Sequence, residues 1–163
     1  MNTELLQRAY EAIGECTPMK TDCGALCSAA CCYTDADGQG GVCLLPGEEK
    51  QLEGLAWGKV DHEPMMDAPM LMCTGMCDRS LRPFLCRIFP LTPVIGKSGK
   101  WTVRMDARAR AVCPLTRGGI NGLDPDFVRS CAKAVRIIAE DAQGEDFLTR
   151  WAAIEAEFRK PLF

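Results

Sequence analysis

The stretch that decides how this chain is built reads Cys23-Gly-Ala-Leu-Cys27-Ser-Ala-Ala-Cys31-Cys32. Cys23, Cys27 and Cys31 are spaced by four residues, so a helix over this stretch would place their sulfurs in one stripe. In a reducing compartment, cysteines this closely spaced are more often metal ligands or redox groups than disulfides. The stretch therefore predicts a thiolate site.

A second group of cysteines lies further along the chain, and we expect the two groups to meet at one site. All-cysteine sites bind zinc or iron-sulfur clusters, with zinc-sulfur distances of ~2.3 Å. The leading prediction is a metal-binding protein that holds one or two zinc ions, and the alternative is an iron-sulfur redox protein or enzyme. A third possibility is a thiol-redox sensor built on the vicinal Cys31-Cys32 pair or on other exposed thiols of the groups. The predicted metal ligands are Cys23, Cys27, Cys31, Cys32, Cys73, Cys77, Cys86 and Cys113.

The remaining cysteines and the nearby arginines have other expected roles. Cys43 lies in an apolar Val-Cys-Leu-Leu segment and Cys131 on the apolar face of a helix, so both are predicted to be packing residues. Cys16 has no predicted role. Because four thiolates around zinc leave about two net negative charges, Arg82 and Arg87 are either supporting cations of the site or plain surface charges.

Composition limits the class of protein and its partners. The 163 residues, 47% hydrophobic and 25% charged, fit one ordinary globular domain over residues 1–163. A net charge of -3 gives no overall attraction for phosphate backbones or anionic lipid, so neither a nucleic-acid nor a membrane partner is expected. The sequence shows no secretory signal and no bilayer-spanning apolar run, so a cytoplasmic location is expected. The 11 cysteines, an odd number, also fit a complete disulfide framework poorly. The sequence indicates no protein partner and no catalytic acid-base pair.

Hydrophobic periodicity predicts helices at both ends of the chain. A first helix ends near Gly14, and the C-terminal helical part covers residues 124–160. There, Asp124-Pro125 begins a long helix that ends at Gly144, and a final helix covers residues 145–159. The apolar face of the long helix carries Phe127, Cys131, Val135 and Ile138.

The middle of the chain predicts a small sheet. Residues 42–45 read as a short strand, and residues 46–58 as a helix opened by proline and acidic residues. Residues 59–72, rich in methionine and proline, read as a loop that ends in a short extended piece. Residues 88–95 and 101–105 flank a Gly-Lys-Ser-Gly turn and predict a hairpin. The expected fold class is α+β, with terminal helices, a small antiparallel sheet and cysteine-rich metal-binding loops.

Two motifs in this order resemble the YkgJ-type cysteine-cluster family, which is described as zinc- or iron-chelating domains. The first is the Cys23–Cys32 stretch, and the second and sharper one is Arg82-Pro-Phe-Leu-Cys-Arg-Ile-Phe-Pro90. Leu45-Pro-Gly-Glu48 between them, and Cys77 and Cys113 around the second motif, also match the family's order. The gaps inside the first cluster vary in this family, so the resemblance does not assign which thiols share a metal.

The resemblance covers about residues 23–114 and implies metal chelation without a defined reaction or substrate. In the second motif, prolines fix the loop. We expect Phe89 to pack beneath the loop and Arg87 to hydrogen-bond sulfur or carbonyl groups beside the site.

Overall fold

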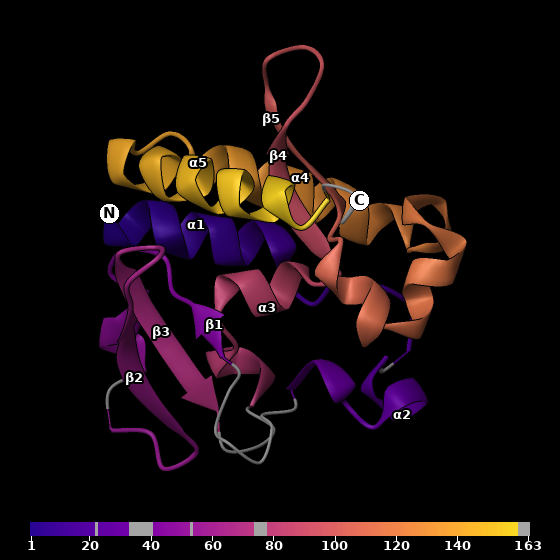
Figure 1. Cartoon of the computed structure of the whole chain (residues 1–163), viewed down its shortest axis with the longest axis horizontal. Helices are drawn as coiled ribbons and strands as arrows, with labels where there is room; N and C mark the ends of the chain where they lie inside the picture. The colour runs from indigo at the N-terminus through magenta and orange to yellow at the C-terminus, as the bar shows by residue number, and fades with distance from the viewer. Residues whose placement is uncertain (22, 33–40, 53, 74–77, 160–163) are drawn as a thin grey trace.

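The computed structural model describes residues 1–21, 23–32, 41–52, 54–73 and 78–159. It is an α+β fold, as the sequence predicts (Figure 1). The helices are α1 (Thr3–Ile13), α2 (Gly24–Cys27), α3 (Phe84–Ile88), α4 (Pro125–Ile138) and α5 (Ala142–Glu157). The strands are β1 (Val42–Cys43), β2 (Gly58–Glu63), β3 (Ala68–Cys73), β4 (Leu91–Ile95) and β5 (Trp101–Met105).

Helix α1 begins and ends where the sequence predicts. The Asn2 side chain accepts a hydrogen bond from the Glu4 N–H at 2.9 Å, which satisfies one of the unpaired donors of the first turn. Gly14 ends the helix with a φ of 52°, a conformation that side chains disfavour. The apolar face of α1 packs along α4, and Leu6, Ala9 and Ile13 are buried there.

Helix α4 supplies much of the main core. Asp124 caps its first turn by accepting from the Asp126 N–H at 2.8 Å. All four residues of the predicted apolar face are fully buried, so the prediction for this helix is confirmed. They are Phe127, Cys131, Val135 and Ile138.

The long helix ends earlier than predicted, and Gly144 has a different role from the one expected. The break falls at residues 139–141, and Asp141 caps α5 by accepting from the Gln143 and Gly144 N–H groups. Gly144 lies inside α5, where a Cβ atom would come within 2.3 Å of the Ile138 carbonyl oxygen. The glycine therefore permits close packing at the junction of the two helices and does not end a helix.

Two antiparallel sheets complete the fold. In the three-stranded sheet β3 lies between β1 and β2, and in the other sheet β4 pairs with β5 as the predicted hairpin. The short extended piece predicted at residues 70–72 is confirmed as part of β3. The loop predicted before it is wrong, because β2 and β3 form a hairpin there. The hairpin was missed because β3 contains Pro69, and proline is rare in a central strand. In the structure the Pro69 carbonyl nevertheless pairs with the neighbouring segment, since it accepts from the Leu44 N–H at 2.8 Å.

The helix predicted over residues 46–58 is also wrong. Among the residues of this stretch that the structure describes, a 3-10 turn at Glu48–Gln51 is the one helical element before β2 begins at Gly58. Glu48 points into the protein and is 1% exposed, although an acidic residue in a first helical turn normally faces water. The Glu48 side chain, one of the acidic residues that suggested a helix start, therefore makes contacts inside the protein.

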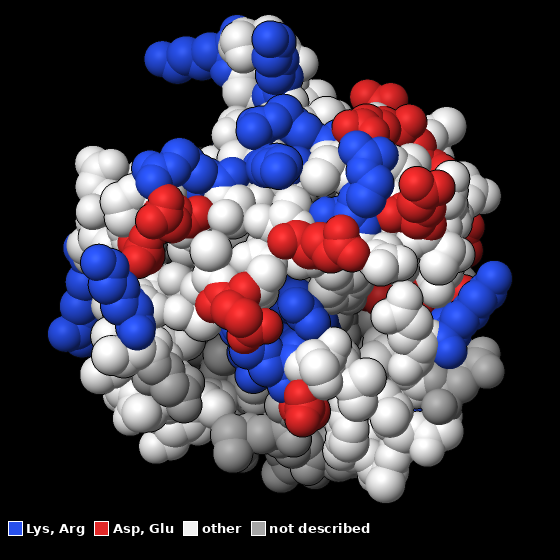
Figure 2. Space-filling model, turned by 180° about the vertical axis from the view of Figure 1, so that it is seen from behind, with Lys and Arg blue, Asp and Glu red and all other residues white. Residues whose placement is uncertain are grey.

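The surface carries both signs of charge. In the view from behind, acidic and basic side chains intermingle over the helices (Figure 2). The surface ion pairs include Arg8–Glu140 and Arg150–Asp146, and such pairs each contribute less than about 1 kcal/mol. Of the helices described, none has the length and apolar character needed to cross a bilayer.

Replacement of Phe127 by alanine tests the central place of α4. We expect Phe127→Ala to lower the free energy of unfolding by about 3–5 kcal/mol, because a fully buried ring leaves a cavity. Urea denaturation followed by circular dichroism measures the loss. The matched control is Arg129→Ala on the exposed side of the same helix, expected to change stability by less than about 0.5 kcal/mol. Equal losses in the two variants would contradict this assignment of the core.

Candidate metal centre

The first cysteine group lies on two short turns and not on one helix. Helix α2 ends at Cys27, because Ser28 and Ala29 adopt left-handed backbone conformations with φ of 51° and 54°. A 3-10 turn then covers Ala30–Cys32. The single stripe of sulfurs expected from the four-residue spacing therefore does not form. Neither turn contains a buried residue, so little apolar packing holds this segment in place.

Five of the predicted ligands nevertheless line one small cavity, which we call the thiol cavity. Its volume is about 70 Å³. Its cysteines come from the first group, from α3 and from the segment after β5, which are far apart in the sequence. Cysteines of both groups thus line one cavity, while a shared site and their role as ligands stay predictions. The five cysteines are Cys23, Cys27, Cys31, Cys86 and Cys113.

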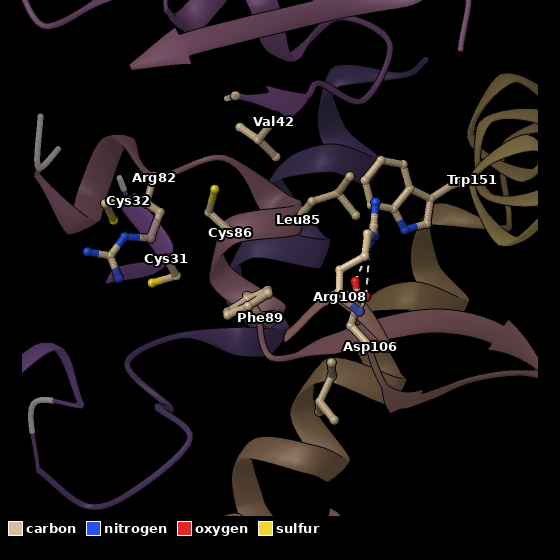
Figure 3. Close-up of a pocket in the computed structure, with 12 residues that line it drawn as sticks. Cys31, Cys32, Val42, Arg82, Leu85, Cys86, Phe89, Asp106, Arg108 and Trp151 are labelled. Atoms are coloured by element: carbon tan, nitrogen blue, oxygen red, sulfur yellow. Dashed lines mark hydrogen bonds and ion pairs between the residues drawn. The ribbon is translucent and has the colours of Figure 1, made fainter. Parts of the chain in front are cut away.

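The other three predicted ligands are placed differently. Cys32 lines a neighbouring cavity, which it shares with Cys31 and Cys86 (Figure 3). Cys73, at the end of β3, packs against the small apolar cluster of the three-stranded sheet. Cys77 lies outside the described residues. The structure therefore separates Cys73 from the thiol cavity, although sequence spacing grouped it with Cys86.

The thiols that the structure describes are not arranged as a formed metal site. Within the described ranges, no three side chains of cysteine, histidine, aspartate or glutamate are positioned to hold a metal ion. No disulfide joins any two of the ten cysteines that the structure describes. A cysteine side chain turns about a single χ1 bond, so thiols that line one cavity can be redirected without moving the backbone.

Cys86 is positioned by a buried carboxylate that the sequence analysis did not assign. The Glu48 Oε1 atom accepts from the Phe84 N–H, the first of α3, at 2.6 Å and also from the Tyr10 hydroxyl. Its Oε2 atom accepts from the Leu45 N–H at 2.8 Å. The carboxylate thus joins α1, the end of β1 and the helix that carries Cys86. The Leu-Pro-Gly-Glu motif was the available signal, but nothing in it gave the direction of the side chain.

Arg87 holds the loop that precedes α3 in the sequence. Its guanidinium donates to the carbonyls of Arg79, Ser80 and Arg82 at 2.8–3.0 Å. It also lies 4.5 Å from the centre of the Tyr10 ring, a cation-π contact. The expected hydrogen bonds from Arg87 to carbonyl groups are therefore observed. Arg79, Arg82 and Arg87 all line the thiol cavity, so cationic side chains surround the place where thiolate charge would gather.

The thiols influence one another. A hydrogen bond from Cys31 lowers the pKa of Cys32 to about 6, and the nearby Arg82 also favours the thiolate. The same hydrogen bond, with burial and the neighbouring thiols of Cys27 and Cys86, raises the pKa of Cys31. This mutual effect indicates that Cys27, Cys31 and Cys86 lie close enough for their charges to interact.

Cys113 belongs to the same set of interacting thiols. Burial raises its pKa, and the nearby Cys27 raises it further. Hydrogen bonds from the backbone N–H groups of Leu115 and Thr116 act in the opposite direction. Backbone donors of this kind favour the thiolate, which is the form that binds metals.

The three cysteines that were not predicted as ligands also stand apart from the thiol cavity. Cys43 is 7% exposed and Cys131 is fully buried, which confirms both as packing residues. Burial raises the pKa of Cys43 to about 11. Cys16 contacts the Ser130 hydroxyl at 3.5 Å, between the end of α1 and α4.

No family model matches the chain, and no curated protein or solved structure matches it either.

The buried Glu48 predicts a specific dependence of stability on pH. Burial raises its pKa above 4.5, outweighing the three hydrogen bonds that lower it. The folded protein then binds the proton more tightly than the unfolded chain. The stability from this group is present below pH 4.5 and is lost as pH rises through the higher, folded-state pKa.

We therefore compare Glu48→Gln, which cannot titrate, with the wild type by urea unfolding at pH values from 4.5 upward. The unfolding free energy of the wild type minus that of the variant should shrink as pH rises. The subtraction removes the titration of groups common to both proteins. A difference that grows with pH would mean that the folded state lowers the pKa of this carboxyl group.

Proposed function

We propose that this protein binds a thiophilic metal, with zinc as the leading candidate, through cysteines of the thiol cavity. The observation that carries the proposal is that Cys23, Cys27, Cys31, Cys86 and Cys113 line one small cavity. Zinc sites made only of cysteine use four thiolates in a tetrahedron, so these five residues supply enough donors for one ion. Cys32, beside the cavity and with a pKa of about 6, is a further donor.

The size and charge of the thiol cavity fit a metal ion better than an organic ligand. Its volume of about 70 Å³ equals that of roughly two water molecules. Its three arginines offset the negative charge that four thiolates around a divalent ion would leave. The resemblance to the YkgJ-type family, which carries Cys86 and Arg87 in its sharper motif, supports the same class of ligand.

The weak packing of the first cysteine group favours a structural role for the metal. A segment without buried residues gains little hydrophobic stabilisation. Bonds to a metal would supply that stabilisation, since the free energy of binding becomes free energy of folding. In this proposal Cys23, Cys27 and Cys31 are anchored to α3 and Cys113 by the ion.

An iron-sulfur cluster uses the same donors and is the alternative cofactor. The set of thiols does not distinguish it from zinc, but the two have different optical spectra. A cluster would make electron transfer the function, whereas zinc has no redox chemistry of its own.

A thiol-redox function is favoured by a different observation, the Cys31–Cys32 hydrogen bond. The bond and Arg82 hold Cys32 as a thiolate near neutral pH, and thiolates are the form that oxidants attack. Cys31 is exposed, so small oxidants can reach this pair. This function requires the pair to remain free of metal.

Anaerobic purification followed by metal and sulfide analysis separates the three functions. Colourless protein with about one or two zinc ions per chain is the expected result. Brown protein that contains iron and acid-labile sulfide would show that the cofactor is an iron-sulfur cluster and not zinc. Folded protein without metal would contradict the proposal and favour the thiol-redox function.

Single cysteine replacements test which thiols bind. Cys86→Ser should lower the metal content to less than about half that of the wild type, because a ligand fixed by α3 is lost. Cys43→Ala is the matched control: Cys43 is buried away from the thiol cavity, so its replacement should leave the metal content unchanged. Inductively coupled plasma mass spectrometry on freshly purified protein measures both. Equal metal content in Cys86→Ser and the wild type would contradict the assignment of this ligand.

A further inference from the structure

A larger cavity lies beside the thiol cavity, and we call it the Trp151 cavity. Its volume is about 230 Å³, roughly that of eight water molecules, so it can take a small organic molecule. Cys31, Cys32 and Arg82 lie at one end, and Arg108 and Trp151 at the other (Figure 3). The proposed metal site does not account for this second end.

The wall of the Trp151 cavity is largely apolar and well fixed. Val42, Leu85 and Leu91 line it together with the Trp151 indole. The indole N–H donates to the Thr92 hydroxyl at 3.0 Å, which sets the orientation of the ring. An apolar wall with an ordered aromatic ring is typical of a binding site for an organic body.

The one strongly ordered cation at this end is Arg108. Its Nε and Nη2 atoms donate to the two oxygens of Asp106 at 3.0 and 2.7 Å. Asp106 is only 3% exposed, and it also accepts from the Arg108 backbone N–H. The guanidinium lies 4.4 Å from the centre of the Trp151 ring. It also lies 5.5 Å from the centre of the Phe158 ring. Arg108 is therefore held along one edge by Asp106 and against two aromatic rings.

The other edge of this guanidinium is available to a ligand. No acceptor in the described part of the chain contacts Nη1 of Arg108, although the residue lines the cavity. A guanidinium edge matches a carboxylate, which can accept two parallel hydrogen bonds from it. Because Asp106 already fixes the arginine, little side-chain entropy is lost when such a ligand binds.

From these observations we propose that the Trp151 cavity binds a small organic carboxylate with an apolar body. The carboxylate accepts from the Nη1 edge of Arg108, and the body lies against Val42, Leu85 and Trp151. The far end of the ligand then reaches toward Cys86 and Cys31, next to the thiol cavity. The recognition itself uses no metal, so this binding function is independent of the proposed metal site.

3-Phenylpropionate is a suitable probe because it combines a carboxylate with a body that the cavity can hold. Amide chemical shifts in two-dimensional ¹⁵N NMR locate the binding and give its Kd. We expect saturable shifts at Val42, Leu85 and Arg108, with a Kd on the order of 1 mM or tighter. The neutral analogue 3-phenylpropan-1-ol should bind at least about tenfold more weakly to the same wild-type protein.

Arginine variants test the role of the guanidinium edge. Arg108→Gln should weaken the binding of 3-phenylpropionate at least about tenfold. Arg110→Gln, an exposed arginine in the same 3-10 turn (Arg108–Ala111), is the control and should bind like the wild type. The comparison of acid with alcohol needs no variant, so it stays decisive even if Arg108→Gln does not fold.

The two sites can be separated in one set of samples. Cys113→Ser lies only in the thiol cavity, so it should lower metal content and leave carboxylate binding intact. Arg108→Gln should do the reverse. The carboxylate proposal is overturned if acid and alcohol bind equally, if shifts map elsewhere, or if nothing saturates by about 10 mM. None of these results bears on metal content, which is measured separately.

Discussion

The three hydrogen bonds to the buried Glu48 carboxylate are the constraint on which the rest of the central region depends. Their donors come from α1, from the residue pair after β1 and from the first N–H of α3. A buried carboxylate is costly unless its oxygens are hydrogen-bonded, so these elements must keep their mutual positions for the fold to hold. Arg87, against the Tyr10 ring, adds a positive charge that favours the carboxylate and joins the loop before α3 to the same point.

This arrangement explains how residues far apart in the sequence reach one cavity. Helix α3 is short and would not fix the direction of Cys86 by its own hydrogen bonds. The Glu48 contacts fix its first turn, and Arg87 fixes the loop that carries Arg79 and Arg82. In the first cysteine group, neither α2 nor the 3-10 turn at Ala30–Cys32 contains a buried residue. One side of the thiol cavity, formed by α3 and the loop before it, is therefore fixed by hydrogen bonds. The other side, formed by the first cysteine group, is not fixed by apolar packing.

Sequence patterns predicted the elements in which the hydrophobic period and the capping residues indicate the same secondary structure. Helices α1 and α4 have both signals, and the β4–β5 hairpin has a clear turn. The β2–β3 hairpin was missed because β3 contains Pro69 and several methionines, which do not resemble a central strand. In that case tertiary pairing overrides local propensity.

The site was predicted in part. Close spacing and residue type placed Cys23, Cys27 and Cys31 in one group, and Cys86 and Cys113 in a second group with Cys73 and Cys77. The structure brings the first five of these to one cavity but separates Cys73 from it. Neither signal gave the inward direction of Glu48, because the orientation of one carboxylate depends on donors that are distant in sequence. The sequence did not predict the Trp151 cavity either, since the cavity brings Asp106 and Arg108 together with an aromatic ring from α5, which is distant in the sequence.

X-ray absorption spectroscopy of the anaerobically purified protein tests the central claim most directly, because it reports the atoms bonded to the metal. Thiolate ligation of zinc predicts a shell of about four sulfur atoms at ~2.3 Å. A shell of nitrogen and oxygen near ~2.0–2.1 Å would contradict binding through the thiol cavity.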